Sequence, residues 1–392
     1  MSTTIENLSP MSPAVLVPPR LRLARLDDYE KIQQLALAHT SDLPAREDWR
    51  RLWLDNPLRT RFGNDFPIGW VLESRSGEMV GTMGTVWALY KFRGNDLVSA
   101  AGRFWFVTAP YRGFALQLMD EYFCQPVDLF INNTVSRAAH APFSQLSSRI
   151  PLGEWDSMSY LVTGYRGFTQ RALERLRLPF TRLLSYPVGA ALWLRDTLSN
   201  RTLPKNAGSF TIETTDRFDI RFDGFWDELV RRNPEKLLAE RTSRALSWHF
   251  GAPMRKGRLW VFTACRNNKI HAYITLTRQD HAFRLPALPH GDTQGIRAMR
   301  LVDYQCIEPE PDLLPALLGA ALQRCAKEDV YVLENLGRGV RKMRAFDDCA
   351  PDREKLSNWK FFYHAADPGL NTELRAARLW DPSAYDGDAS FE

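Results

Sequence analysis

Residues 97–123, LVSAAGRFWFVTAPYRGFALQLMDEYF, decide how the rest of this 392-residue chain is interpreted. The β-branched and aromatic run from Phe104 to Thr108 is typical of a strand. Pro110 and Gly113 interrupt that run, and apolar residues then recur at helical spacing up to residue 123. We therefore predict a strand, a short turn and a helix. The first N–H groups of such a helix lack partners within the helix and lie at the positive end of its dipole, so this turn is suited to binding phosphate.

The turn resembles the acyl-CoA-binding motif of the GNAT (Gcn5-related) acyltransferases, Q/R-x-x-G-x-G/A. Aligned on the arginine, the sequence reads Arg112, Gly113, Phe114, Ala115, Leu116, Gln117. Ala115 stands at the first glycine position of the motif and Gln117 at the second small position. A methyl group at the first position still lets a backbone approach a pyrophosphate, whereas the glutamine side chain must turn away from it. Taken alone, the turn is equally compatible with an ordinary strand-to-helix connection.

The segments around the turn follow the order of elements in GNAT domains. Residues 21–38 predict a strand and a helix, and residues 68–73 and 79–90 predict two strands joined by a hairpin turn. Residues 127–132 predict a further strand, and residues 134–148 predict a helix. The order β, α, β, β, β, α, β, α over about residues 20–165 is more specific than the turn motif alone.

The second half of the chain repeats this pattern more faintly. The predicted elements are a helix at 222–230, a hairpin of strands at 259–266 and 270–278, a strand at 299–307, a helix at about 312–326, a strand at 330–334, a basic helix from about Arg338, and a strand at 359–364. The junction after the 299–307 strand contains Glu308, Glu310 and Asp312 and has no glycine. Three carboxylates would repel a pyrophosphate, so we expect any cofactor in the first domain.

These elements predict an α/β protein with α+β layering. We expect two tandem GNAT-like domains, each a mixed, mostly antiparallel sheet flanked by helices. The expected division is a disordered lead at 1–18, a GNAT domain with the acyl-CoA motif at 19–168, an interdomain helical linker at 169–208, and a second, degenerate GNAT-like domain at 209–392.

Composition fits a soluble enzyme of two domains, with 44% hydrophobic and 25% charged residues. The net charge of +5 is too small to indicate a nucleic-acid partner. Five scattered cysteines without a C-x-x-C pair predict a reducing compartment and no metal site. We find no signal peptide and no apolar run of the ~18 residues that span a bilayer, and therefore expect a cytoplasmic protein without a transmembrane segment.

The segment at residues 171–198 mixes arginines with leucines and aromatic residues. It could lie on a membrane surface as a basic amphipathic element, which would be a peripheral membrane contact. Alternatively, it forms an interdomain helix that is packed against both cores and broken at Pro179 and Pro187. The sequence leaves both interpretations open.

The GNAT resemblance implies how acyl-CoA would be bound. Backbone N–H groups of the central strand, at Phe106, Val107 and Thr108, would polarise the thioester carbonyl. The pyrophosphate would bind to the turn, at Arg112, Gly113, Phe114, Ala115 and Leu116. Asn132 and Asn133 match the asparagine that contacts the pantetheine arm in the family, although an Asx turn or a helix cap explains the pair as well.

Candidates for proton transfer are harder to identify. Many GNAT enzymes use a tyrosine of the last helix as the general acid, but residues 141–148 contain none. Ser144 could act through a water molecule, and His140 could act as a base because imidazole titrates near neutral pH. Tyr160, on the strand expected to follow, is a third candidate.

The resemblance implies an acyl-CoA-dependent acyltransferase, most simply an N-acetyltransferase that uses acetyl-CoA or another acyl-CoA. Residues 151–168, 244–250 and 385–388 are also similar to tandem GNAT-like proteins that accompany bacterial exopolysaccharide synthesis. The acceptor would then be an amine of a small molecule or of a cell-envelope or polysaccharide precursor. Two alternatives stay open: a Fem-like transferase that uses aminoacyl-tRNA, and a non-catalytic GNAT-like partner protein in a polysaccharide pathway.

Overall fold

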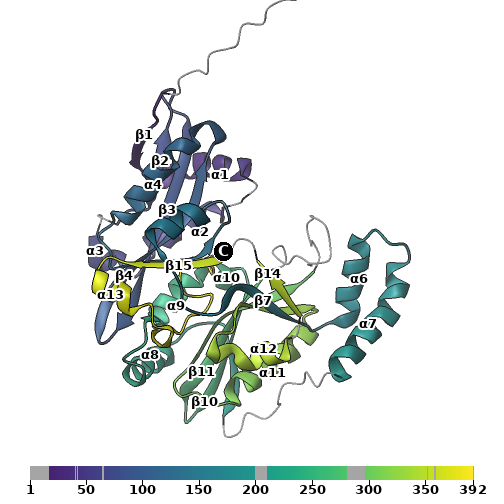
Figure 1. Ribbon diagram of the computed structural model, residues 1–392. Coiled ribbons are helices and arrows are strands. Elements are labelled where there is room, and N and C mark those ends of the chain that lie inside the picture. The colour runs from purple at the N-terminus through teal and green to yellow at the C-terminus, as the bar shows by residue number, and fades with distance from the viewer. Residues whose placement is uncertain are drawn as a thin grey trace, which may run out of the picture. The chain divides into compact units, whose positions relative to one another are not determined.

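The computed structural model describes residues 17–39, 41, 43–63, 66–198, 210–279, 296–350, 352–356 and 359–391 (Figure 1). Nearly all of the predicted disordered lead lies outside the described residues, and so does the end of the predicted linker. Among the residues described, no helix combines the length and the apolar character needed to cross a membrane.

Contacts divide the chain into two compact units. The first unit contains Met1–Arg46, Pro67–Thr85 and Gly102–Gln125, and the second contains Glu47–Phe66, Val86–Ala101 and Pro126–Glu392, as far as these ranges are described. Two long strands, β3 (Met79–Phe92) and β4 (Asn95–Val107), contribute residues to both units. This division does not follow the predicted domain boundaries at residues 168 and 208, which stay a prediction.

The first unit contains the predicted phosphate-binding turn, with the end of the strand before it and the helix after it. Its strands β1 (Arg20–Leu23) and β2 (Gly69–Glu73) pair antiparallel, and β2 pairs in the same way with β3. Its helices are α1 (Tyr29–Ala38) and α4 (Ala115–Phe123), and α4 lies against β2. The apolar side of α4 buries Leu118, Met119 and Tyr122. The predicted element order is confirmed in this region.

Strand β4 is distorted at Phe104, whose φ of 55° lies in the left-handed region. This conformation is costly for a bulky residue inside a strand and is typical of a β-bulge. Gly84 of the neighbouring β3 accommodates the distortion, because a Cβ there would lie 3.2 Å from the Arg103 carbonyl oxygen and 3.5 Å from the Phe104 ring. The kink therefore depends on a glycine opposite it.

In the second unit, β4 continues the first sheet by pairing in parallel with β5 (Leu129–Val135). Strand β15 (Lys360–Ala365) pairs antiparallel with β5 and with β6 (Ser148–Arg149), and β9 (Leu238–Ala239) pairs with β3. The parallel pairing of β4 and β5 involves Ser99 with Leu129 and Ala100 with Phe130. The helix α5 (His140–Leu146) contacts β15.

The second sheet lies entirely within the second unit. Its strand order is β14 (Asp352–Lys355), β7 (Glu154–Val162), β13 (Val332–Arg338), β12 (Ala298–Cys306), β11 (Lys269–Arg278), β10 (Leu259–Arg266) and β8 (Thr211–Thr215). Within this order only β12 and β13 pair in parallel. The helices α8 (Arg221–Arg232) and α11 (Leu313–Lys327) contact β11, and α12 (Arg344–Cys349) contacts β7. Two mixed sheets flanked by helices confirm the predicted fold class.

Several predicted elements differ in extent. The helix predicted at 134–148 is only α5, because Thr134 and Val135 extend β5 and Val135 pairs with Lys360 of β15. The basic helix predicted from Arg338 is reduced to the 3₁₀ turn η4 (Arg341–Met343) and α12, since β13 continues to residue 338. Gly337, with φ of 82°, lets the Trp155 ring approach to 2.7 Å from the position of a Cβ.

Other elements were not predicted from the sequence. They are short, and several are rich in charged residues. The repeat of apolar residues that identifies a helix or strand therefore covers too few positions to be recognised. They include the strands β6, β8, β9 and β14 and the helical elements η1 (Leu26–Asp28), α2 (Arg46–Leu54), α3 (Arg59–Phe62), α9 (Ser243–His249), α10 (Gly251–Arg255), α13 (Pro368–Glu373) and η5 (Ala377–Leu379). Nevertheless, α2 buries Trp49 and Trp53 in the second unit.

The two sheets exchange strands across the predicted domain boundary. Strand β7, expected in the first domain, pairs with β13 and β14 of the second sheet. Strand β15, expected in the second domain, lies between β5 and β6 of the first sheet. Neither half of the sequence therefore completes a sheet by itself.

The predicted linker forms a hairpin of two helices, α6 (Tyr165–Arg175) and α7 (Thr181–Leu198). Pro179 lies between them as expected, but Pro187 lies inside α7 and does not end it. Large apolar side chains of α7, such as Leu183 and Leu198, are exposed, and the packing of this segment against both cores stays a prediction.

A buried ion network fixes the polar interior of the second unit. The Arg241 guanidinium donates from Nε and Nη2 to the two carboxylate oxygens of Asp303, at 2.8 and 3.1 Å, and both side chains are fully buried. The Tyr273 and Ser383 hydroxyls donate to the same carboxylate, each at 2.6 Å. Burial acts to raise the pKa of Asp303, but the Arg241 charge outweighs it and holds that pKa below its usual range.

We predict that Asp303→Asn lowers the free energy of unfolding by about 3–5 kcal/mol, because the buried Arg241 charge then keeps Asp386, at 3.3 Å, as its carboxylate partner and loses the closer one. Asp348→Asn, which removes an exposed ion pair with Arg344, is the control and should cost less than about 1 kcal/mol. Urea denaturation at neutral pH measures both. A depressed carboxyl pKa stabilises the fold above the unfolded-state pKa of about 3.9, so the difference between the wild type and Asp303→Asn should shrink as the pH falls below that value. Equal losses for the two variants would contradict the role of the network.

Because Phe104 has a positive φ, glycine should destabilise the protein less than alanine at this position, the reverse of the usual order within a strand. At Phe104 we expect Phe104→Gly to be more stable than Phe104→Ala by about 0.5–1 kcal/mol, because glycine adopts positive φ without strain. At Phe106, two residues further along the same strand and outside the left-handed region, glycine should instead be the less stable replacement by about 0.5–1 kcal/mol. Denaturation midpoints of the four variants test this. The same order at both positions would argue against backbone strain at Phe104.

Candidate active site

The predicted phosphate-binding turn lies between β4 and α4 and forms a 3₁₀ helix, η3 (Ala109–Phe114). The Tyr111 N–H donates to the Thr108 carbonyl at 3.0 Å, and the Ala115 N–H donates to the Arg112 carbonyl. In both bonds the amide donates to the carbonyl three residues earlier, as in a 3₁₀ helix. Backbone amides that we had expected to be unpaired at the start of the helix are therefore already bonded. The helix itself begins at Ala115.

The turn is open to solvent. Arg112, Gly113 and Leu116 are exposed, whereas Phe114 and Ala115 are half-buried. A Cβ placed on Gly113 would meet no described atom within 4 Å. The arginine and the glycine backbone are therefore accessible to an anion, while their predicted contact with pyrophosphate stays a prediction.

The end of β4 is held by hydrogen bonds from two sides. The Thr108 N–H donates to the Val80 carbonyl of β3 at 2.9 Å, so this amide is already bonded. On the other side, His39 Nε2 lies 3.1 Å from the Val107 carbonyl oxygen. A role of the Phe106, Val107 and Thr108 amides in polarising a thioester stays a prediction.

His39 is a functional candidate that the sequence did not reveal. It follows the last residue of α1, and its Nδ1 lies 2.9 Å from the Leu35 carbonyl oxygen. Its ring also lies 5.4 Å from the Phe106 ring. Neutral imidazole has one N–H, so it donates to one of the two carbonyls, at Leu35 or Val107, at a time. His39 thereby connects the first helix to the end of the central strand, and no spacing or motif indicated this contact.

Asn133 holds the C-terminal segment of the chain. Its Oδ1 accepts from the Asp388 and Ala389 N–H groups at 2.9 and 2.8 Å, and its Nδ2 donates to the Asp386 carbonyl. Asp388 in turn accepts from the Asn133 N–H at 2.9 Å and from the Thr134 hydroxyl. Both predicted asparagines lie inside β5, so the alternative of a helix cap or Asx turn is wrong. Asn132 and Asn133 are buried, and their contact with a pantetheine arm stays a prediction.

Two of the proton-transfer candidates lie on α5. His140 is half-buried, and its ring lies 5.5 Å from the Phe362 ring of β15. Ser144 is exposed and donates its hydroxyl to the Ala141 carbonyl at 2.8 Å. Phe362 is also the β-sheet partner of Asn132. The structure thus places Asn132 and His140 against the same aromatic residue.

Tyr160 lies elsewhere, on β7 of the second sheet, where it pairs with Glu334 and Asp352. Burial is the main cause that raises the pKa of Tyr160 to about 12. Its phenol therefore keeps its proton at neutral pH and can donate a hydrogen bond, but it cannot act as a base. The structure does not bring it onto the helix that carries His140 and Ser144.

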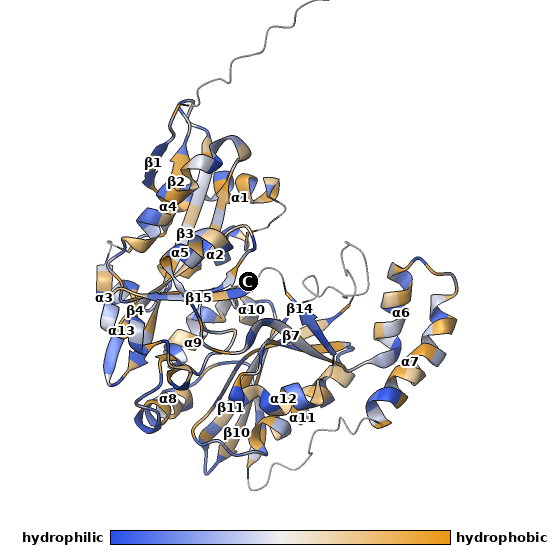
Figure 2. Ribbon diagram, in the orientation of Figure 1, coloured by the Kyte–Doolittle hydropathy of each residue, from blue (hydrophilic) through white to orange (hydrophobic). Residues whose placement is uncertain are grey.

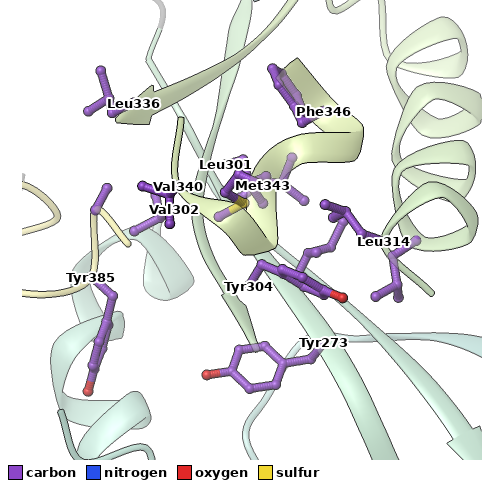
Figure 3. Packing of buried hydrophobic residues seen from close by; sticks show 14 of the residues in the cluster. Tyr273, Leu301, Val302, Tyr304, Leu314, Leu336, Val340, Met343, Phe346 and Tyr385 are labelled. Carbon is purple, nitrogen blue, oxygen red and sulfur yellow. The ribbon is translucent and has the colours of Figure 1, made fainter. Parts of the chain in front are cut away.

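In the second sheet, β12 is the strand that pairs in parallel with its neighbour, as β4 does in the first sheet. The C-terminal segment of the chain covers it. The parallel pairing of β12 with β13 ends at Leu301 and Asn335, and the next residue, Val302, accepts a hydrogen bond from the Tyr385 N–H at 3.1 Å. Figure 3 shows Val302 packed among Val340, Met343 and Leu301. At the acidic junction, Glu308 forms an ion pair with Arg232.

Among the residues that the structure describes, no cluster of histidine, cysteine, aspartate and glutamate has the arrangement of a metal site.

Comparison with known proteins gives structural relatives alone. No protein-family model matches the chain, and no curated protein matches its sequence. A conserved protein from Enterococcus faecalis V583, described as a probable N-acyltransferase, is 10% identical with a TM-score of 0.53, over 89% of this chain and 73% of that one. N-myristoyltransferase of Saccharomyces cerevisiae, with bound myristoyl-CoA, is 12% identical with a TM-score of 0.52. The match covers 93% of this chain and 87% of that one.

A GCN5-related N-acetyltransferase from Anabaena variabilis is 9% identical with a TM-score of 0.50, over 89% of this chain and 73% of that one. At such low identity the likeness concerns the fold. The chain therefore shares the fold of GCN5-related N-acetyltransferases, as the order of its elements predicted, and that of N-myristoyltransferase.

Proposed function

We propose that this protein is an acyl-CoA-dependent acyltransferase whose cofactor binds at the first sheet. The observation that carries the proposal is the exposed turn with Arg112 and Gly113, which follows the central strand in a chain with this fold. One structural relative holds myristoyl-CoA, and others are named N-acetyltransferases, which supports the same class of reaction here.

In this proposal, Arg112 attracts the pyrophosphate, and Gly113 lets the phosphates approach the backbone. The amides of Phe106 and Val107 polarise the thioester carbonyl, while Phe114, Ala115 and Leu116 border the same turn. The acceptor amine attacks the carbonyl carbon, the tetrahedral oxyanion collapses, and the CoA thiolate leaves with a proton. The distortion at Phe104 turns the strand just before these amides.

For proton transfer we propose His140 as the general base toward the acceptor, because half-burial keeps its ring accessible. Ser144 would relay a proton through water. Tyr160 lies on the second sheet, so it has no proton-transfer role in this proposal. Asn132 would orient the pantetheine arm from β5, with Asn133 occupied mainly by the C-terminal segment.

The finer assignments are part of this proposal. They are N-acetyl transfer from acetyl-CoA, an amine of a small molecule or of a polysaccharide precursor as acceptor, and a cytoplasmic location. The covered strand β12 and the acidic residues Glu308, Glu310 and Asp312 support placing the cofactor at the first sheet rather than the second. The proposed tandem domains keep the boundaries predicted from the sequence, with β7 and β15 exchanged between the two sheets.

A non-catalytic partner protein is the second candidate, and one observation favours it. The 3₁₀ bonding of η3 engages amides that would otherwise face a pyrophosphate. The two candidates differ in whether the turn binds acyl-CoA at all, so binding is the first property to test.

We predict that saturating acetyl-CoA or a longer acyl-CoA raises the melting temperature, because ligand at about 100 times its Kd stabilises the folded state by roughly 2.7 kcal/mol. Arg112→Glu should abolish this increase by placing a negative charge beside the phosphates. Arg75→Glu, at an exposed turn of the same unit, is the matched control and should keep the full response. Differential scanning fluorimetry measures all three proteins. No shift with CoA or any acyl-CoA would favour the non-catalytic candidate.

We further predict that His140→Ala lowers kcat by roughly 10²–10⁴-fold without changing the thermal response to acyl-CoA, since a general base contributes to the chemical step and not to cofactor binding. Thiol release from acetyl-CoA with a panel of primary amines and amino sugars measures the rate. Gln145→Ala, an exposed change on the same helix, serves as the control. An unchanged kcat in His140→Ala would exclude this residue as the base.

A further inference from the structure

The helical hairpin α6–α7 is attached to the second sheet mainly at one end. Gly167 of α6 lies against the Tyr331 ring so closely that a Cβ would be 2.2 Å from it. The Tyr165 hydroxyl donates to Asp196 at 3.1 Å and thereby ties the start of α6 to the end of α7. Figure 1 shows the two helices side by side, reaching away from the strands of the second sheet.

Only a narrow stripe of α7 is packed. Ser185 and Gly189 are buried, and Leu192 and Asp196 are half-buried. These four positions recur every three or four residues and so form one side of the helix. Gly189 brings α7 into close contact with α6, because a Cβ there would lie 3.3 Å from backbone atoms of Tyr165 and Arg166. The remaining circumference of α7 faces solvent.

The exposed side of α7 is apolar. Leu183, Leu194 and Leu198 lie opposite the packed stripe and are 69%, 49% and 76% exposed. Phe180, at the turn between the helices, is 75% exposed. Of the sixteen exposed large apolar side chains among the described residues, ten belong to this hairpin and its turn. Figure 2 shows the corresponding hydrophobic colouring along α7. Such a concentration is typical of an interaction surface.

The hairpin also carries most of the net charge of the protein. Residues 165–198 contain six arginines, no lysine and two acidic residues, a net charge of +4 against +5 for the whole chain. The two acidic side chains, Glu174 and Asp196, pair with Arg171 and Arg195. Arg177 and Arg182, in the turn and at the start of α7, are exposed beside the apolar side chains.

We propose that the α6–α7 hairpin binds the surface of an anionic phospholipid membrane, with α7 lying in the plane of the interface. Its apolar side would enter the boundary of the acyl chains, and the arginines would bind lipid phosphates. Trp193 and Tyr186 are 54% and 55% exposed, and such aromatic side chains favour the level of the lipid headgroups.

The charge argues for a membrane over a second copy of the protein. A symmetric dimer through this face would bring two surfaces of +4 together, and like charges oppose such contact. An anionic bilayer instead attracts each arginine near its surface. This inference goes beyond the proposed function, because it concerns residues outside the candidate active site and does not depend on acyl-CoA binding.

Flotation of the full-length protein with vesicles tests the proposal. We expect binding to vesicles of phosphatidylcholine with phosphatidylglycerol and little binding to phosphatidylcholine alone. The double variant Leu183→Ser/Leu194→Ser should reduce the partition coefficient by about tenfold or more, because two exposed apolar side chains no longer enter the bilayer. Arg177→Glu/Arg182→Glu should reduce it similarly, and salt should weaken wild-type binding, since the screening length falls from about 10 Å at 0.1 M to about 3 Å at 1 M.

Matched controls lie outside the hairpin. Ile220→Ser replaces an equally exposed apolar residue, and Arg344→Glu replaces an exposed arginine, so both variants should bind vesicles like the wild type. Light scattering in solution measures the oligomeric state and so tests the alternative that the hairpin binds a second copy of this protein. The proposal fails if the protein does not float with anionic vesicles, if the controls lose binding as much as the hairpin variants, or if the leucine variant converts a dimer into monomers.

Discussion

Buried and half-buried carboxylates need hydrogen-bond donors, and in the second unit this requirement fastens the C-terminal segment to both sheets. Asp388 binds the Asn133 backbone and the Thr134 hydroxyl on β5 of the first sheet. Asp386 contacts Arg241, which also neutralises Asp303 on β12 of the second sheet. Two strands from different sheets thus depend on three neighbouring residues, Asp386 to Asp388. An apolar segment could fill the same volume, but it would not satisfy the polar groups of these strands.

The same segment makes the two sheets unlike each other. Beside β12, it covers the strand with Ser383 and Tyr385, and the following acidic junction engages Arg232. After β4, the turn with Arg112 and Gly113 stays exposed. The chain therefore has an accessible strand-to-helix turn after β4, whereas β12 is covered by the C-terminal segment. This difference gives the second half of the chain a structural role in the proposed enzyme, since its strand β15 completes the first sheet.

Much of the fold could be predicted because its evidence is local. Some elements show a regular spacing of apolar residues within about fifteen residues. They are the hairpin of β10 and β11, the helix α11, and the strand, turn and helix around Pro110. The strand exchange could not be predicted in this way, because β7 and β15 are ordinary strands whose partners lie far away in the sequence. Pro187 was misjudged because it lies on the solvent side of α7, where the packed stripe on the other side maintains the helix.

The candidate site was predicted less completely. The exposed turn was found from its motif, but a motif does not show whether amides are already bonded, and the 3₁₀ geometry of η3 was missed. His39 and the fastening role of Asn133 depend on single long-range hydrogen bonds, which leave no period or spacing in the sequence. Tyr160 was grouped with α5 because the two are close in the chain, whereas pairing places it in the other sheet.

The place of β15 between β5 and β6 has a consequence during synthesis on the ribosome. Val135 of β5 is made long before its partner Lys360, and at about 5–20 residues per second the interval is on the order of ten to forty seconds. During that time this edge of β5 presents unsatisfied backbone groups, which can pair with other nascent chains. The first sheet can therefore reach its full strand order only after the residues of β15 have been synthesised.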